Sequence, residues 1–271
     1  MSIITLTTDL GFKDPYVAAL KGAIYSAMPE CTVVDVSHMV GKQDEGQAGF
    51  ILRAAYRYFP PGTIHINAVS RDISSSAIYI GLKHKGHYFI GSDNGVFSLV
   101  LDEKPDEITQ LDSVINFSSH SFPCLDILVP AACKLAKGAS LSSLGVVKDS
   151  IQKQMFFNPV IEDSRITGAV IYIDGFGNVF TNITRESFEQ TFKGKPIKIV
   201  MKNLTHTIAS ISQVYGDVMP GEILAFFNSL GLLEIAQNCG SASKYLGLKM
   251  SDKIWIEAND NKGSKNDFQK W

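Results

Sequence analysis

The sequence predicts an α/β N-terminal domain with a mostly parallel sheet, followed by a smaller all-β, barrel-like C-terminal domain. Two observations support this. Strand patterns alternate with helical periodicity as far as about residue 140. From about residue 166, short strand patterns and turns follow one another with little helical periodicity. We place the domains at 1–150 and 165–258, with a flexible tail over 259–271.

The first domain opens with a buried strand over 2–8 and then a loop and a helix. Asp14 can cap this helix, and Pro15 suits its first turn because proline lacks the N–H that a helix start leaves unbonded. The elements expected next are a buried strand at 32–37, a helix at about 44–58, a strand at 62–70, a hairpin at 77–93 and a helix at about 125–137.

The second domain shows β-branched and aromatic runs separated by turn residues. Such runs are typical of the short strands of a sandwich or barrel. The predicted strands lie within 165–173, 178–183, 196–203, 206–211, 222–228 and 232–238.

The composition of the 271 residues indicates a soluble globular protein, with 45% apolar and 19% charged residues. A formal charge of −2 gives no electrostatic reason to expect nucleic acid. The four cysteines form no C-x-x-C pair and the six histidines form no H-x-x-x-H pattern, so we expect no disulfide framework and no metal site. No signal-like segment or long apolar run is present, which predicts a cytoplasmic protein without a membrane partner.

The stretch "VIYIDGFGNVFTNI" at 170–183 predicts two strands joined by an unusual turn. A tight hairpin needs glycine or asparagine, but Asp174, Phe176 and Asn178 add a carboxylate, an aromatic ring and an amide. One interpretation is a hairpin with a packed phenylalanine. The other is a small-molecule pocket floored by backbone glycines.

Asp9 ends the first predicted strand, where α/β sheets bind their ligands. A carboxylate there can accept both hydroxyls of a ribose, or it can cap the following turn. No phosphate-binding glycine loop follows the strand, so a bound nucleoside need not carry phosphates.

Two further turns carry polar side chains. Asp93, Asn94 and Gly95 form a glycine-bracketed turn whose simplest interpretation is a type I′ hairpin. Near the C-terminus a turn with Ser229 precedes Glu234, which lies inside an apolar run. A glutamate in such a run either lies on a solvent face or holds the amine of a ligand.

Five motifs occur in an order that resembles one family, the S-adenosylmethionine (SAM) hydroxide adenosyltransferases, which are related to SAM-dependent fluorinases and chlorinases. The resemblance spans about residues 2–258. The motifs are "TTDLG" at 7–11, "DVSH" at 35–38, "DNG" at 93–95, "IDGFGNV" at 173–179 and "LEIA" at 233–236 after Asn228-Ser229.

The resemblance implies a homotrimer in which SAM lies between the N-terminal domain of one subunit and the C-terminal domain of a neighbour. Asp9 would hold the ribose hydroxyls and Tyr215 would stack on the adenine. Asp174 and Asn178 would bind the methionine ammonium and carboxylate. Ser229 would assist Asp174 and Asn178 in binding the methionine end, and Phe176 would help shape the turn. Glu234 completes the expected substrate-binding residues, and SAM is the expected ligand, with no cofactor or metal.

The sequence departs from the family where its members carry a water-activating Asp-Arg-His set. Ser70 stands at the position of the aspartate, Ser75 and Ser76 at the arginines, and Pro123 at the histidine. One hypothesis is a relocated catalytic set of Ser70, Arg71 and Asp72, which would hydrolyse SAM to adenosine and L-methionine. The alternatives are an inactive SAM- or adenosine-binding module that senses or sequesters its ligand, and a SAM-dependent halogenase.

Overall fold

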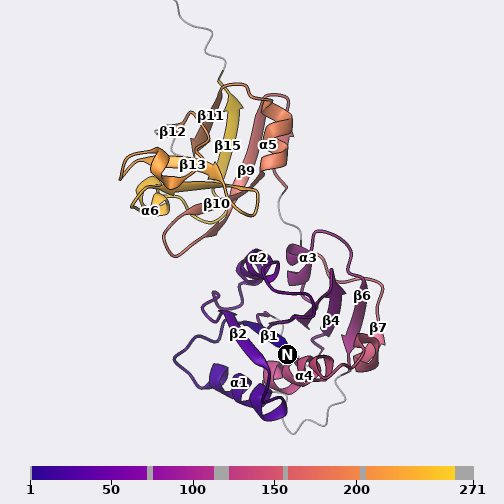
Figure 1. The fold of residues 1–271 in the computed structure, drawn as a ribbon. Coiled ribbons are helices and arrows are strands. Elements are labelled where there is room, and N and C mark those ends of the chain that lie inside the picture. Colours follow the sequence, from indigo (N-terminus) through magenta and orange to yellow (C-terminus); the bar gives the residue numbers. More distant parts are fainter. Residues whose placement is uncertain (1, 72–75, 113–121, 155–157, 202–205, 260–271) are drawn as a thin grey trace, which may run out of the picture. The chain divides into compact units, whose positions relative to one another are not determined.

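A computed structural model describes residues 2–71, 76–112, 122–154, 158–201 and 206–259 of the chain. The chain divides into two compact units, Met1–Phe156 and Phe157–Trp271 (Figure 1). Nearly all of the tail predicted at 259–271 lies outside the described residues. No described helix combines the length and the apolar character that crossing a membrane requires.

The first unit is built on one seven-stranded sheet in the order β2-β1-β3-β5-β4-β6-β7. Its strands are β1 (Ile3–Thr7), β2 (Thr32–Ser37), β3 (Ile64–Asn67), β4 (Tyr79–His84), β5 (His87–Ser92), β6 (Glu107–Leu111) and β7 (Gly145–Val147). The pairings β2–β1, β1–β3 and β3–β5 are parallel. The pairings β5–β4, β4–β6 and β6–β7 are antiparallel.

The prediction of a mostly parallel sheet is therefore wrong, because half of the pairings are antiparallel. The cause is the hairpin between β4 and β5. Its turn consists of Lys85 and Gly86, both with positive φ (49° and 81°), and two residues can connect only antiparallel neighbours. A parallel pair needs a crossover of about a dozen residues.

Helices cover both faces of this sheet. One face carries α1 (Tyr16–Ala27) and α4 (Val129–Ala136), and the latter continues a π-helix at Cys124–Leu128. The other face carries α2 (Glu45–Tyr56) and α3 (Val96–Val100). A 3₁₀ turn at Leu141–Leu144 completes the unit.

The helix starts follow the capping chemistry only in part. The Asp44 side chain accepts a hydrogen bond from the Gln47 amide at 2.9 Å and caps α2. In α1 the capping position is Pro15, which has no side-chain cap, so the prediction that Asp14 caps this helix is wrong. The predicted turn at Asp93–Gly95 leads from β5 into α3 and is not a hairpin turn.

The second unit is an antiparallel sheet in the order β12-β11-β15-β9-β10-β14-β13, with β8 paired to β9. The end strands β12 and β13 contact each other, so the sheet is nearly closed and barrel-like. Its strands are β8 (Val160–Glu162), β9 (Arg165–Ile173), β10 (Val179–Thr184), β11 (Ile197–Met201), β12 (Thr207–Ile208), β13 (Ile223–Phe227), β14 (Leu232–Gln237) and β15 (Lys253–Ala258).

This unit is not all-β as predicted, because it contains the short helices α5 (Arg185–Phe192) and α6 (Ala242–Leu246), and a 3₁₀ turn at Tyr215–Asp217. Eight and five residues offer too few apolar positions to reveal a helical period. The Thr184 side chain caps α5 by accepting a hydrogen bond from the Ser187 amide at 3.1 Å.

Candidate functional site

A polar pocket of about 230 Å³ lies in the first unit, next to Asp9 just beyond the end of strand β1. Because β1, β3 and β5 are parallel neighbours, their carboxyl ends lie at one edge of the sheet. The pocket is lined by Asp9, Leu10, Gln43, Ala68, Ser70, Tyr79, Ser92, Phe122, Pro123, Cys124 and Leu128. Its mixed polar and apolar lining suits a small polar molecule.

Asp9, the predicted ribose ligand, lies in this pocket and is partly buried. Its Oδ2 accepts a hydrogen bond from the Gln43 amide at 2.8 Å. Burial, together with the charge of Asp9, raises the pKa of the neighbouring Cys124 thiol to about 12. Cys124 therefore stays a neutral thiol at physiological pH and offers no nucleophile.

Of the three predicted catalytic residues, one lines this pocket and a second is bonded to a residue that lines it. Ser70 lines it. Arg71 donates a hydrogen bond from Nε to the Gln43 carbonyl oxygen at 3.1 Å. Asp72 falls outside the described residues, so its predicted role stays a prediction. Pro123, which stands where the family pattern has a histidine, also lines the pocket.

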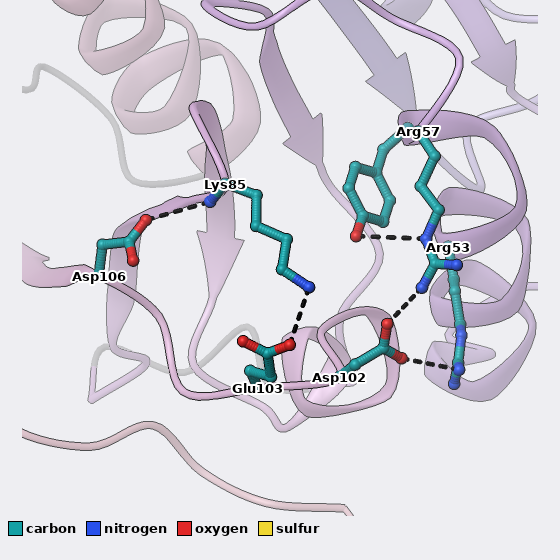
Figure 2. Close-up of polar contacts among 7 residues, drawn as sticks. Arg53, Arg57, Lys85, Asp102, Glu103 and Asp106 are labelled. Atoms are coloured by element: carbon teal, nitrogen blue, oxygen red, sulfur yellow. Dashed lines mark hydrogen bonds and ion pairs between the residues drawn. The ribbon is translucent and has the colours of Figure 1, made fainter.

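A larger cavity of about 550 Å³ lies beside α3 and the segment 149–154. Figure 2 shows the charged groups around the loop that lines it. Asp102 pairs with Arg53 at 2.8 Å and also with Arg57. Glu103 pairs with Lys85 at 3.0 Å. Asp102 and Glu103 therefore have cationic partners within the protein, and we favour as the site the smaller pocket, which lies at the carboxyl ends of the parallel strands.

In the second unit the turn at 174–178 is the hairpin connection between β9 and β10, as predicted. Asp174 organises it: Oδ1 accepts from the amides of Phe176 and Asn178, both at 2.9 Å, and Oδ2 accepts from Asn178 Nδ2 at 3.0 Å. Gly177 has a φ of +86°, and a Cβ there would lie 2.0 Å from Ser241 Oγ. Only glycine fits this position.

This turn belongs to a larger group of polar side chains, which we call the acidic cluster: Asp174, Asn178, Tyr215, Asn228 and Glu234. The Tyr215 hydroxyl lies 3.4 Å from Asn178 Nδ2 and donates to Glu234 Oε1 at 2.8 Å. Asn228 Nδ2 donates to Glu234 Oε2 at 3.2 Å. The structure thus brings together four of the predicted substrate-binding residues, and adds Asn228.

The electrostatics of the acidic cluster are unbalanced. Glu234 is only 3% exposed, and its burial, with a contribution from the charge of Asp174, raises its pKa. The pKa of Tyr215 is raised by burial and by its bond to Glu234. Within the part of the chain that the structure describes, no lysine, arginine or histidine pairs with either carboxylate. The cluster therefore favours a cationic ligand group.

The two remaining predicted residues face solvent. Phe176 is 80% exposed, so the interpretation of a packed phenylalanine is wrong. Ser229 is exposed in the turn between β13 and β14. Sequence reasoning missed Gln43, Tyr79 and Ser92 as pocket residues. No sequence signal predicts the position of Gln43, which has an unusual φ of 58°. Tyr79 and Ser92 could have been predicted to lie together, because they are direct partners across the predicted hairpin.

The fold and the two sites are typical of a two-domain protein of the small-molecule-binding class, with a small pocket in an α/β unit and an acidic cluster in a barrel-like unit. The model of the SAM hydroxide adenosyltransferase N-terminal domain matches residues 4–145, and that of the C-terminal domain matches residues 168–255. The chain therefore belongs to the SAM hydroxide adenosyltransferase family.

Individual relatives cover nearly the whole chain. A protein of Salinispora tropica named (R)-S-adenosyl-L-methionine hydrolase is 29% identical over 265 residues, covering 94% of this chain and 97% of the relative. A fluorinase of Nocardia brasiliensis is 25% identical and covers 94% of this chain and 96% of its own. The crystal structure of a conserved protein from Thermotoga maritima aligns with a TM-score of 0.86 and 31% identity, covering 94% of this chain and 99% of that one.

Proposed function

We propose that this protein uses water or hydroxide to cleave SAM into adenosine and L-methionine. The observation that carries the proposal is the near-complete alignment with a relative named (R)-S-adenosyl-L-methionine hydrolase. An oxygen of water attacks C5′ of the ribose, and the bond from C5′ to the sulfonium sulfur breaks. The electron pair of that bond goes to sulfur, which becomes the neutral thioether of methionine, and the water proton passes to solvent. A sulfonium ion leaves readily, so alignment of the nucleophile supplies much of the catalysis.

The pocket in the first unit is the proposed nucleoside site. Asp9 would accept the ribose hydroxyls with its carboxylate, which the Gln43 amide holds in place. The pocket lies at the edge of the sheet where α/β proteins bind ligands, and no phosphate-binding loop is required for an adenosyl group.

The acidic cluster is the proposed site for the methionine end. Asp174 and Glu234 present two carboxylates with no cationic partner among the described side chains, and the α-ammonium of methionine supplies that cation. The amide of Asn178 and the exposed hydroxyl of Ser229 are proposed to receive the α-carboxylate, and Tyr215 to stack on the adenine. Exposed Phe176 would form the wall of the site.

The proposed nucleophile side is the loop with Ser70, Arg71 and Asp72. Ser70 lines the pocket directly, and Arg71 is bonded to the same Gln43 that holds Asp9. These groups would orient the attacking water. The reaction as written needs no metal and no cofactor.

The two sites lie in different units, and we propose that one SAM molecule binds between the first unit of one subunit and the second unit of a neighbour in a homotrimer. The proposal is supported by large exposed apolar side chains beside both sites, Phe12 and Tyr16 in the first unit and Phe176 in the second. A monomeric mass in light scattering at working concentration would contradict it. We also propose a cytoplasmic location, where SAM is available.

A second candidate is a SAM- or adenosine-binding module without turnover. It is favoured by Ser70 and Pro123, which line the pocket at positions where the family pattern has an aspartate and a histidine. Neither side chain can act as a general base at neutral pH.

The test is incubation of purified protein with excess SAM, with adenosine and methionine followed by chromatography and binding followed by calorimetry. Adenosine beyond one equivalent supports hydrolysis, and binding without product supports the module. Parallel reactions with and without chloride detect halide transfer, which would yield a chlorinated adenosine. Loss of adenosine release with retained SAM binding in Asp72→Asn would support a catalytic role for Asp72, and unchanged release would remove it.

A further inference from the structure

We infer that Glu45 is a positioning residue for the nucleophile loop Val69–Arg71 of the pocket, and that the Asp93–Gly95 turn serves the same purpose. The inference rests on the proposed function. It assigns a role to a buried carboxylate that does not line the pocket and to a motif that the reaction itself leaves unused.

Glu45 is the first residue of α2 and is only 5% exposed. Its Oε1 accepts hydrogen bonds from the Arg71 amide at 3.1 Å and from Asn94 Nδ2 at 2.9 Å. Its Oε2 accepts from Gln154 Nε2 at 2.7 Å. One carboxylate therefore joins three segments that are far apart in the sequence.

Asn94 holds the same loop from its other end. Its Nδ2 also donates to the Val69 carbonyl at 3.1 Å, so Glu45 and Asn94 bracket Ser70. The backbone carbonyl of Asn94 accepts a hydrogen bond from Gln154 Nε2 at 3.2 Å. The side-chain Oδ1 of Asn94 accepts a hydrogen bond from the Val96 amide at 3.1 Å. All the polar atoms of this side chain are thus used within the protein, which makes the turn a support rather than a ligand site.

The network continues to the ribose side of the pocket. Arg71, whose amide is bound by Glu45, donates from Nε to the Gln43 carbonyl, and the Gln43 amide donates to Asp9. The wall that would orient the water and the carboxylate that would hold the ribose are therefore connected through Glu45. Attack at C5′ requires both to be held in register.

The arrangement depends on a group that only accepts hydrogen bonds. In Glu45→Gln the new amide nitrogen must face either the Gln154 amide or the Arg71 and Asn94 donors, so a donor meets a donor. The volume is unchanged, so the loss is one of hydrogen-bond pattern. A loosened loop costs alignment in the transition state more than it costs ligand affinity.

The experiment compares wild type with Glu45→Gln, Gln154→Glu and the exchanged double variant. Each single variant should lower kcat for adenosine release by about tenfold or more, with SAM affinity changed by less than about threefold. The double variant restores a carboxylate–amide pair in the opposite sense, but its carboxylate at position 154 cannot donate to the Asn94 carbonyl, so it should recover only part of kcat. Glu103→Gln, a change of the same type at an exposed ion pair of the same unit, should leave kcat unchanged.

Hydrogen exchange at the Arg71 amide provides a readout that needs no turnover. The Glu45→Gln variant should exchange this amide faster than wild type, and the double variant more slowly than Glu45→Gln. If wild type releases no adenosine, the proposed function fails, and exchange alone then decides whether Glu45 holds the loop.

The inference is overturned if Glu45→Gln keeps wild-type kcat and wild-type exchange. Should Glu45→Gln fail to fold, Asn94→Ala tests the same loop, because it removes the donors to Glu45 and to Val69. Wild-type kcat in Asn94→Ala would then overturn the inference.

Discussion

The Tyr215 hydroxyl lies 2.8 Å from Glu234 Oε1 and donates a hydrogen bond to this buried carboxylate. The other carboxylate oxygen is bonded by the neutral amide of Asn228 at 3.2 Å. Neutral donors thus surround a charge that burial disfavours. Binding of a cation beside Glu234 would relieve this cost, which makes the pair the most sensitive test of the proposed ammonium site.

Glu234→Gln should weaken SAM binding by about tenfold or more, because it removes a charged partner of the ammonium while keeping the side-chain volume. Adenosine lacks the methionine end, so its affinity should stay the same. Titration calorimetry with each ligand measures both. Glu189→Gln, on the exposed face of α5, is the matched control. Equal loss for SAM and adenosine would contradict the assignment.

The raised pKa of Glu234 also predicts a dependence of stability on pH. Burial makes the folded protein hold this proton above the usual pKa of 4.5. The stabilisation is complete below that value and is lost as pH rises through the folded pKa. The free energy of unfolding of Glu234→Gln, relative to that of wild type, should therefore be higher at about pH 7.5 than at about pH 4.5.

Trp255 in β15 of the same unit provides the signal for this comparison in denaturant unfolding followed by fluorescence. The quantity of interest is the difference in unfolding free energy between the variant and wild type at the two pH values. A difference that does not change with pH would show that Glu234 is ionised at no cost in the folded protein.

Local sequence signals were sufficient for the elements that form from adjacent residues. The hairpin at 77–93 and the turn at 174–178 were predicted because their turn residues lie next to the strands they join. The strands β6 and β7 were not predicted, because the antiparallel pairings of β6 with β4 and of β7 with β6 depend on contacts between distant segments. The helices α5 and α6 were missed because they are too short to show periodicity.

The same division applies to the site. Asp9, Asp174 and Asn178 could be predicted as candidate ligands because each follows or joins a predicted strand, and the structure places Asp9 in the pocket and the other two in the acidic cluster. Gln43 and Glu45 were not found, because they act through bonds to residues 26 to 34 positions away in the sequence. Nothing in "GKQDEG" distinguishes these residues from an ordinary polar helix start.

Asp9→Asn tests the nucleoside site by itself. Asparagine can still accept a hydrogen bond from the Gln43 amide, so the loop should be kept. Adenosine affinity should fall by about tenfold, because a charged acceptor for the ribose hydroxyls is replaced by a neutral one. Calorimetry with adenosine is the measurement, and exposed Asp14→Asn in the following turn is the control. An unchanged dissociation constant would place the ribose elsewhere.

The first unit should lose stability in acid through His65. This histidine is fully buried, with Nδ1 2.8 Å from Thr5 Oγ1 and Nε2 3.2 Å from His87 Nδ1. Burial, and secondarily the neighbouring His87, lowers its pKa from 6.5 to about 3. Below pH 6.5 this histidine is protonated in the unfolded chain but stays neutral in the folded chain. The stability that is present above pH 6.5 is therefore lost as the pH falls to about 3. The full shift corresponds to roughly 5 kcal/mol.

His65→Gln removes the titrating group, so the thermal transition of the first unit should depend less on pH in this variant than in wild type. Scanning calorimetry between about pH 7 and about pH 4.5 measures the difference in slope. His206→Gln, at a partly exposed position of the second unit, should keep the wild-type slope. The slope is the relevant readout because the substitution also changes stability at neutral pH through its lost contacts. Identical slopes in His65→Gln and wild type would mean that acid unfolds the unit through other groups.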